Sequence, residues 1–311
     1  MKLGGIHHIT AITGDAPANV EFYVGVLGLR MVKKTVNQDD PTVYHLFYAD
    51  EQGSPGADLT FFEYPGARPG TAGAGMVHRV VWRVASDDAI RFWEQRLADR
   101  GVETERGEEG GLRFADPEGL EHELVVYAGA DAPLIADAPD IPAEHALQGF
   151  DAVRAYAGDP GRSAALLRET LGFTGGEDGS WEVRGDERGG RYIYDAPPAN
   201  RPVPGAGTIH HVAFASPIEE HDAWQQRLTR AGARATPVID RFYFRSIYFR
   251  EPSGVLFEIA TIGPGFGADE DPSHLGERLS LPPKFERLRS ELERSLTPLP
   301  DPRAALASRT D

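Results

Sequence analysis

The sequence predicts an α+β fold built from four copies of one βαβββ module. An apolar strand, an amphipathic helix and further strands recur along the chain, with starts near residues 5, 76, 149 and 208. The second and fourth copies close alike, because an acid-Pro-x-Gly turn is followed four residues later by a glutamate. One such small sheet cannot cover its own apolar face, so we expect the modules to pair into two domains.

Periodicity and turn residues define the elements of the first two modules. The apolar spacing of Val20, Tyr23 and Val24 predicts a helix that ends before Gly28, and Ser86 is suited to cap the helix of the second module. Alternating β-branched and aromatic residues predict the strands. The expected elements are strand 5–13, helix 16–26, strands 44–48 and 59–62, then strand 76–82, helix 88–100 and strands 111–114 and 120–127.

The third and fourth modules repeat this order, and a tail follows them. Phe285, Leu288 and Leu292 have helical spacing, so we expect a helix near 284–295 that docks on the body. The expected elements are strand 149–153, helix 161–171, strands 180–183 and 190–194, then a strand from 208, helix 218–231 and strands 242–249 and 255–261.

Consecutive modules suggest a division of the chain into two domains. Residues 1–130 would form an N-terminal domain from modules one and two, and residues 146–262 a C-terminal domain from modules three and four. Residues 131–145 are rich in Ala, Asp and Pro and are expected to be the linker. Residues 263–311 are expected to form the tail with its helix.

The composition excludes several classes of function. The net charge of −16 argues against a nucleic-acid surface. The absence of cysteine excludes a disulfide scaffold, thiolate metal sites and cysteine nucleophiles. No apolar run is long enough to span a bilayer and no signal segment is present, so we expect a cytoplasmic protein with no membrane partner.

Two positions of the repeated module could supply metal ligands. Only a pairing of the first module with the fourth gives a complete set, which would build one site across the whole chain. This interpretation comes from ligand counting and favours a different pairing from the consecutive one. The residues at the first-strand position are His8, Arg79, Ala152 and His211, and those at the last-strand position include Thr60, Glu123 and Glu258.

The set His8, His211 and Glu258 competes with simpler interpretations. The His7-His8 pair could be a surface pair, and Glu123 is better explained as an ion-pair partner of Arg79. Glu258, however, lies in an apolar strand, where burying an unpaired carboxylate is costly.

Two histidines and one carboxylate leave the other octahedral positions of a metal open. That pattern is typical of non-haem Fe(II) oxygenases, because substrate and dioxygen both need room on the metal. A fourth protein ligand would indicate a hydrolytic or isomerising site. Thr60 stands where that acid would have to be, which favours the three-ligand interpretation.

The chain resembles the ring-cleaving dioxygenases of the vicinal oxygen chelate superfamily. Within them it is similar to the branch of hydroquinone 1,2-dioxygenase and 2,6-dichlorohydroquinone dioxygenase. Gln38 departs from the branch, where an aromatic residue is expected. The matching segments cover nearly the whole chain and are 6–10, 32–37, 39–41, 44–46, 76–79, 207–211, 241–248, 257–260, 263–266 and 281–283.

The resemblance implies two vicinal-oxygen-chelate domains, Fe(II) on the three ligands, and an aromatic diol and dioxygen as substrates. Mn(II) suits the same ligands, and a homodimer is the expected assembly. Because alternate residues of a strand share a face, Thr10 should lie on the same face as His8. His7 and His210 are adjacent to the implied ligands and should point away from them unless the strands twist. The implied roles are metal ligation by His8, His211 and Glu258, catalysis by His7, His210, Arg241 and Tyr248, and substrate binding by Thr10.

Two other functions are compatible with the predicted fold, since unrelated functions can share one scaffold. A glyoxalase-type, metal-dependent isomerase or lyase would need a fourth protein ligand. A drug-sequestering binding protein without chemistry would lack the metal site.

Overall fold

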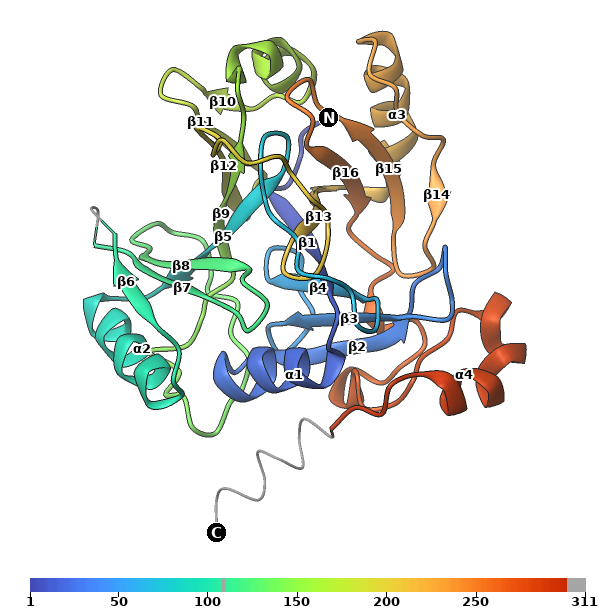
Figure 1. Cartoon of the computed structure of the whole chain (residues 1–311). Coiled ribbons are helices and arrows are strands. Elements are labelled where there is room, and N and C mark those ends of the chain that lie inside the picture. Colours follow the sequence, from blue (N-terminus) through green and yellow to red (C-terminus); the bar gives the residue numbers. More distant parts are fainter. Residues whose placement is uncertain (108–109, 301–311) are drawn as a thin grey trace.

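Antiparallel pairing of β1 (Ile6–Thr13) with β13 (Ile209–Ser216) joins the first and last modules into one sheet. The computed structural model describes residues 1–107 and 110–300. β1 also pairs in parallel with β4 (Asp58–Glu63), and β13 with β16 (Leu256–Thr261). The order of this first sheet is β14-β15-β16-β13-β1-β4-β3-β2 (Figure 1).

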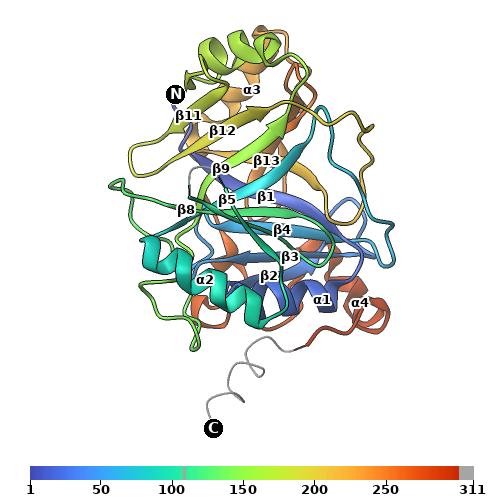
Figure 2. The ribbon, with the colours of Figure 1, turned by 60° about the vertical axis from the view of Figure 1, so that its left-hand side comes forward.

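The second and third modules form an equivalent second sheet. β5 (Val77–Val84) pairs antiparallel with β9 (Phe150–Tyr156), and the order is β10-β11-β12-β9-β5-β8-β7-β6. The first strands of the four modules therefore lie in the middle of the sheets (Figure 2). The other strands are β2 (Arg30–Val36), β3 (Tyr44–Ala49), β6 (Thr104–Arg106), β7 (Leu112–Ala115), β8 (Glu121–Val126), β10 (Thr174–Gly175), β11 (Ser180–Arg184), β12 (Gly189–Asp195), β14 (Ile239–Asp240) and β15 (Arg245–Arg250).

The sheets combine the modules as ligand counting predicted and do not follow the division into consecutive halves. Residues 1–130 and 146–262 each contribute one module to each sheet, so modules one and two do not share a sheet. The reason is that one edge of each module's first strand forms hydrogen bonds with the last strand of the same module. The other edge of the first strand pairs with the first strand of a module far along the chain.

The helices follow the predicted positions but are less regular. Ser86 caps α2 as predicted, because its side chain accepts a hydrogen bond from the amide of Ala89. The module helices are α1 (Ala16–Val20) with the π-helical turn η1 (Glu21–Val26), α2 (Asp87–Asp99), the short η2 (Pro160–Ser163) and η3 (Leu166–Thr170), and η4 (Ile218–Glu220) with α3 (His221–Arg230). None of the helices within the described ranges combines the length and apolar character needed to cross a membrane.

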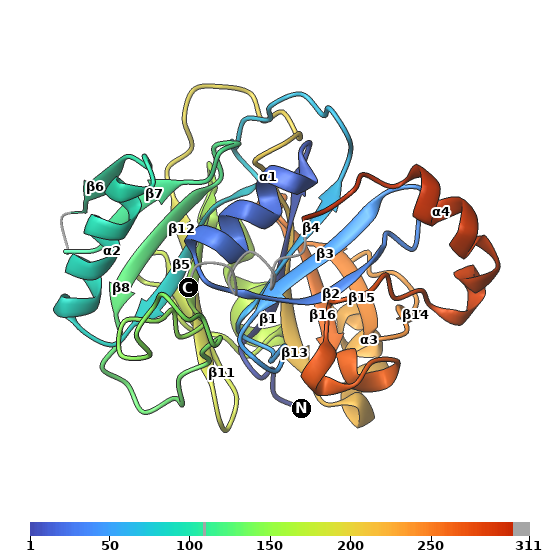
Figure 3. The ribbon, with the colours of Figure 1, turned by 90° about the horizontal axis from the view of Figure 1, so that it is seen from below.

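The tail packs beside the β2 end of the first sheet, away from α2 (Figure 3). The helix predicted near 284–295 is confirmed, and Leu292 is buried where it docks. Residues 301–311 of the predicted tail lie outside the described residues. The tail contains η5 (Phe266–Ala268), η6 (Pro272–His274), η7 (Pro283–Leu288) and α4 (Arg289–Ser295).

Several strands differ from the sequence prediction, and the short strands β6, β10 and β14 were not predicted. β2 was not predicted as a strand, because Lys33 and Lys34 interrupt its apolar pattern. The strand predicted from residue 242 begins at Arg245, because Phe242 has a positive φ of 70° and belongs to a turn.

The two faces of the first sheet have different surroundings. Ile9, Phe214 and Ile259 belong to the main apolar core. Ala213 and Ala260 point the other way and belong to a smaller apolar cluster with residues of β2, β3 and the tail. Because side chains alternate along a strand, the residues that alternate with the main core share this second face. The candidate site is on this face.

Candidate metal centre

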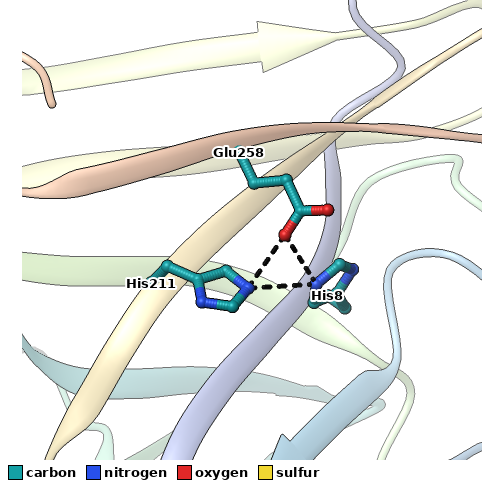
Figure 4. A group of neighbouring side chains, drawn as sticks. All are labelled: His8, His211 and Glu258. Atoms are coloured by element: carbon teal, nitrogen blue, oxygen red, sulfur yellow. Dashed lines mark hydrogen bonds and ion pairs between the residues drawn. The ribbon is translucent and has the colours of Figure 1, made fainter. Parts of the chain in front are cut away.

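Three side chains from neighbouring strands converge on one point of the first sheet (Figure 4). His8 Nε2 lies 3.3 Å from His211 Nε2, and Glu258 Oε2 lies 3.3 Å from His8 Nε2 and 2.9 Å from His211 Nε2. Their exposed fractions are 1%, 3% and 0%. Across residues 1–107 and 110–300, this is the one group of three or more His, Cys, Asp or Glu residues whose ligand atoms could hold one ion.

The separations suit a metal ion. Ligand atoms about 2.1 Å from a metal in adjacent octahedral positions lie about 3 Å from one another. Neither carboxylate oxygen of Glu258 accepts a hydrogen bond of good geometry from the described residues, although both are buried. A buried carboxylate in that state is stabilised by a cation, so the donor set fits a metal.

The protonation states also suit metal binding. Burial would raise the pKa of Glu258, but His8 and His211 hold it well below its usual range. Burial lowers the pKa of His211, although Glu258 opposes this in part. The carboxylate is therefore ionised and His211 is neutral, and these are the forms that bind metals.

Two β-bulges turn His7 and His210 toward the ligands. In the pairing of β1 with β13, His7 is an extra residue on β1 and His210 is an extra residue on β13. His7 Nδ1 lies 2.9 Å from Nδ1 of His8, and His210 Nδ1 lies 2.8 Å from Nδ1 of His211. Strand parity predicted that both would point away. The bulges change the parity and overturn that expectation.

These contacts determine which nitrogen of a ligand histidine is free. His7 Nε2 lies 3.2 Å from the carbonyl oxygen of Thr261 and donates to it. Its Nδ1 therefore accepts the Nδ1–H of His8, which leaves a lone pair on His8 Nε2 for a metal. His7 is therefore positioned to orient His8. Nδ1 of His210 and Nδ1 of His211 are also in contact, but no partner of His210 Nε2 within residues 1–107 and 110–300 fixes which of the two carries the proton.

Thr10 lies beside Thr60, where a fourth acidic ligand would have to stand. The two hydroxyl oxygens are 2.9 Å apart, and the Thr60 oxygen is 2.8 Å from His45 Nε2. The hydroxyl of Thr60 is thus held by two neighbours. His45 was given no role from sequence, although its alternation with Phe47 along β3 is a signal that both share the pocket face.

A pocket beside the triad includes His8 and His211 in its wall. Most of the rest of the wall is aromatic or comes from residues 35–39 of the first module. The aromatic residues of the wall, besides histidines, are Phe47, Phe62, Tyr243, Phe244 and Tyr248.

Arg241 and Tyr248 both line this pocket. The ring centre of Tyr248 is 5.6 Å from that of His211, and the Arg241 guanidinium lies 5.5 Å from the Tyr248 ring centre. Arg241 also forms a two-pronged ion pair with Asp39, with both N···O distances 2.9 Å. Its charge is therefore partly neutralised at the pocket.

Ion pairs fill the equivalent position of the second sheet. Arg79 stands in place of a ligand histidine and lies 2.8 Å from Glu121 and 3.2 Å from Glu123. The predicted ion pair between Glu123 and Arg79 is confirmed. Ala152 stands in place of the second histidine, so this position offers no ligand set.

Two paired-module sheets and a buried two-histidine, one-glutamate site define a fold of the vicinal-oxygen-chelate type with a candidate metal centre. The model of the Glyoxalase/Bleomycin resistance protein/Dioxygenase superfamily matches residues 5–124 and 149–259. The chain belongs to this superfamily.

Its relatives are named as dioxygenases. The chain is 42% identical to "Putative ring-cleaving dioxygenase MhqO" of Bacillus subtilis, over 96% of this chain and 97% of that protein. It is 31% identical to "Chlorohydroquinone/hydroquinone 1,2-dioxygenase" of Sphingobium indicum, over 95% and 96%. A crystal structure titled as a putative dioxygenase from Bacillus subtilis matches with a TM-score of 0.89 and 39% identity, over 96% of this chain and 98% of that one. The chain therefore groups with enzymes of the dioxygenase class.

Proposed function

We propose that the chain is an Fe(II)-dependent dioxygenase that opens the ring of a hydroquinone- or catechol-type diol with dioxygen. The observation that carries the proposal is the buried triad of two histidines and one carboxylate, a set typical of non-haem Fe(II) oxygenases. The name of the Sphingobium relative supports a diphenol as substrate. Bound Fe(II) would supply open positions for substrate and dioxygen and pass electrons between them, and Mn(II) suits the same ligands.

The residues of the chain would prepare the site for this chemistry. His7 would hold His8 in the metal-binding tautomer, and His210 would restrain the ring of His211. The aromatic wall would pack against the substrate ring and exclude water. Burial and the charge of Glu258 raise the pKa of Tyr248 above its usual value, so its hydroxyl would stay protonated and could donate to a substrate oxygen.

The glyoxalase-type alternative is less well supported. A fourth ligand would have to come from the position of Thr60, whose hydroxyl is engaged with Thr10 and His45. Within the described residues, no further His, Cys, Asp or Glu joins the triad.

The test is oxygen uptake by anaerobically purified, Fe(II)-loaded protein offered hydroquinones and catechols in turn. We expect uptake matched by a ring-opened product, and loss of both metal and uptake in His8→Ala and Glu258→Ala. Glu123→Ala is the matched control, because Glu123 stands at the equivalent position of the second sheet and should leave both intact. Metal binding with lyase activity in the absence of dioxygen would favour the isomerase. Absence of metal binding would refute the proposal.

A further inference from the structure

Several polar side chains on the pocket wall are already engaged with the protein, although Gln38 Oε1 has no hydrogen-bond partner among the described residues. Arg241 is paired with Asp39, and the hydroxyl of Tyr243 donates to Asp269 at 2.9 Å. The side-chain amide of Gln38 donates to the carbonyl of Arg241. A substrate hydroxyl would have to displace one of these contacts to bind there.

His45 is different, because one of its nitrogens is fixed and the other is open. Its Nε2 lies 2.8 Å from the Thr60 hydroxyl. Its ring packs against Phe47 and Phe62, with ring centres 4.0 and 4.4 Å away, so its orientation is restrained on two sides. Its Nδ1 has no hydrogen-bond partner among residues 1–107 and 110–300. Nδ1 is also not one of the buried side-chain atoms that lack a partner. The ring forms part of the pocket wall.

The surroundings of His45 keep it neutral. Burial holds the pKa of His45 well below its usual value and the Arg241 guanidinium lowers it further, against the opposing effect of Glu258. A neutral imidazole has one donor and one acceptor nitrogen. If Nε2–H donates to Thr60 and Thr60 donates to Thr10, Nδ1 is left as a hydrogen-bond acceptor on a ring that forms part of the pocket wall.

We propose that His45 Nδ1 accepts a hydrogen bond from the substrate hydroxyl that is not bound to the metal. This inference rests on the proposed dioxygenase function and adds a specificity-determining residue to it. The hydroxyls of a 1,4-diphenol lie on opposite ring carbons, so only one can reach the metal and the other is left to meet a wall residue. Both hydroxyls of a catechol can reach the metal together. His45 therefore favours diphenols of the hydroquinone type.

Two substitutions distinguish the contributions of the two ring nitrogens of His45. In His45→Gln the side-chain amide can replace Nε2 and keep the Thr60 contact, but the Nδ1 acceptor is lost. In His45→Asn the amide can replace Nδ1 but falls short of Thr60. The exposed His274 supplies the control, His274→Gln. Metal content and thermal unfolding of each variant establish that the site is intact.

The experiment measures anaerobic binding to the metal-loaded protein, so that no turnover interferes. The ligands are hydroquinone, its monomethyl ether 4-methoxyphenol, whose second oxygen has no hydrogen to donate, and catechol. We expect His45→Gln to weaken hydroquinone binding about 10-fold, the usual effect of one lost hydrogen bond. Its affinity for 4-methoxyphenol and catechol should be unchanged, and His45→Asn should recover part of the loss.

The outcomes separate this inference from the proposed function. Equal weakening of all three ligands, or no weakening of any, in a wild type that consumes oxygen with hydroquinone would overturn the role of His45 alone. A wild type that binds metal but neither binds nor oxidises any diphenol would overturn both.

Discussion

The Nδ1 atoms of His7 and His8 lie 2.9 Å apart, although the two residues are consecutive in one strand. Consecutive strand residues normally point to opposite faces, and only the β-bulge at His7 brings both rings together. Because His7 also donates to the Thr261 carbonyl, the contact fixes the proton of His8 on Nδ1. The bulge therefore connects the pairing of β1 with β13 to the tautomer of His8, a candidate metal ligand.

Replacing His7 should therefore weaken metal binding without removing a ligand. We expect His7→Phe to lower the metal affinity about 10- to 100-fold, the usual effect of losing the partner of a ligating histidine. The measurement is competition with a chelator of known affinity. His78 is the bulge residue of β5 in the second sheet, so His78→Phe is the matched control and should leave the affinity unchanged. Equal affinities of the two variants would count against the orienting role.

Removing the partner of Arg241 should change which diphenols bind. Both terminal nitrogens of Arg241 donate to the Asp39 carboxylate. Asp39→Asn would therefore remove the ionic partner of the Arg241 guanidinium on the pocket wall. We expect 2,5-dihydroxybenzoate, which carries a carboxylate, to bind about 5-fold more tightly, a gain typical of a partly exposed ion pair. Uncharged hydroquinone should gain little. Asp40→Asn is the control, since Asp40 bonds to Thr42 within its own loop. A similar gain in both variants would refute the prediction.

Lys33 should be a major contributor to the stability of the tail. Its ammonium is fully buried and binds Asp269 at 2.8 Å, the carbonyl of Phe266 at 3.0 Å, and Glu270. Lys33→Met would leave these acids without their partner, so we expect a loss of about 3 kcal/mol and a fall in Tm of roughly 5 °C or more. Lys34→Met, at a more exposed position of the same strand, should change Tm much less. Calorimetry on both variants is the measurement, and equal Tm values would contradict the assignment.

His122 should make stability depend on pH. Its Nδ1 accepts the indole N–H of Trp82 at 3.1 Å, and its Nε2 lies 3.0 Å from the Tyr23 hydroxyl. Burial lowers its pKa from 6.5 to about 3. As pH falls below 6.5, the unfolded chain gains a proton that the folded chain does not, so stability is lost from pH 6.5 down to about 3.

The size of this effect follows from the pKa difference. Between pH 6.5 and pH 5 the loss should be about 2 kcal/mol. Unfolding in denaturant at pH 5 and pH 7, for wild type and His122→Gln, isolates the contribution, because the other titrating groups are common to both proteins. The variant should lose less stability at pH 5. Equal losses would mean that His122 is protonated in the folded protein.

Much of the architecture and the triad could be predicted because the signals are local. The module repeats within about seventy residues, its turns carry Gly and Pro, and the His-His pairs and Glu258 each lie within one short apolar strand. Counting ligands by module position was sufficient to predict that the first and last modules meet, which the shared sheet confirms. These features depend on residue type and spacing alone.

The features that could not be predicted from the sequence depend on contacts between segments that lie far apart in the chain. The bulges that redirect His7 and His210 arise in the pairing of β1 with β13, about two hundred residues apart, and parity along one strand cannot reveal them. His45, the ion pair of Asp39 with Arg241 and the buried Lys33 acquire their surroundings only when β2, β3, the last module and the tail pack together. Sequence by itself determined which residues could be ligands. The tertiary structure decided their tautomers, their neighbours and the shape of the space before them, because those properties are set by atoms from the whole chain.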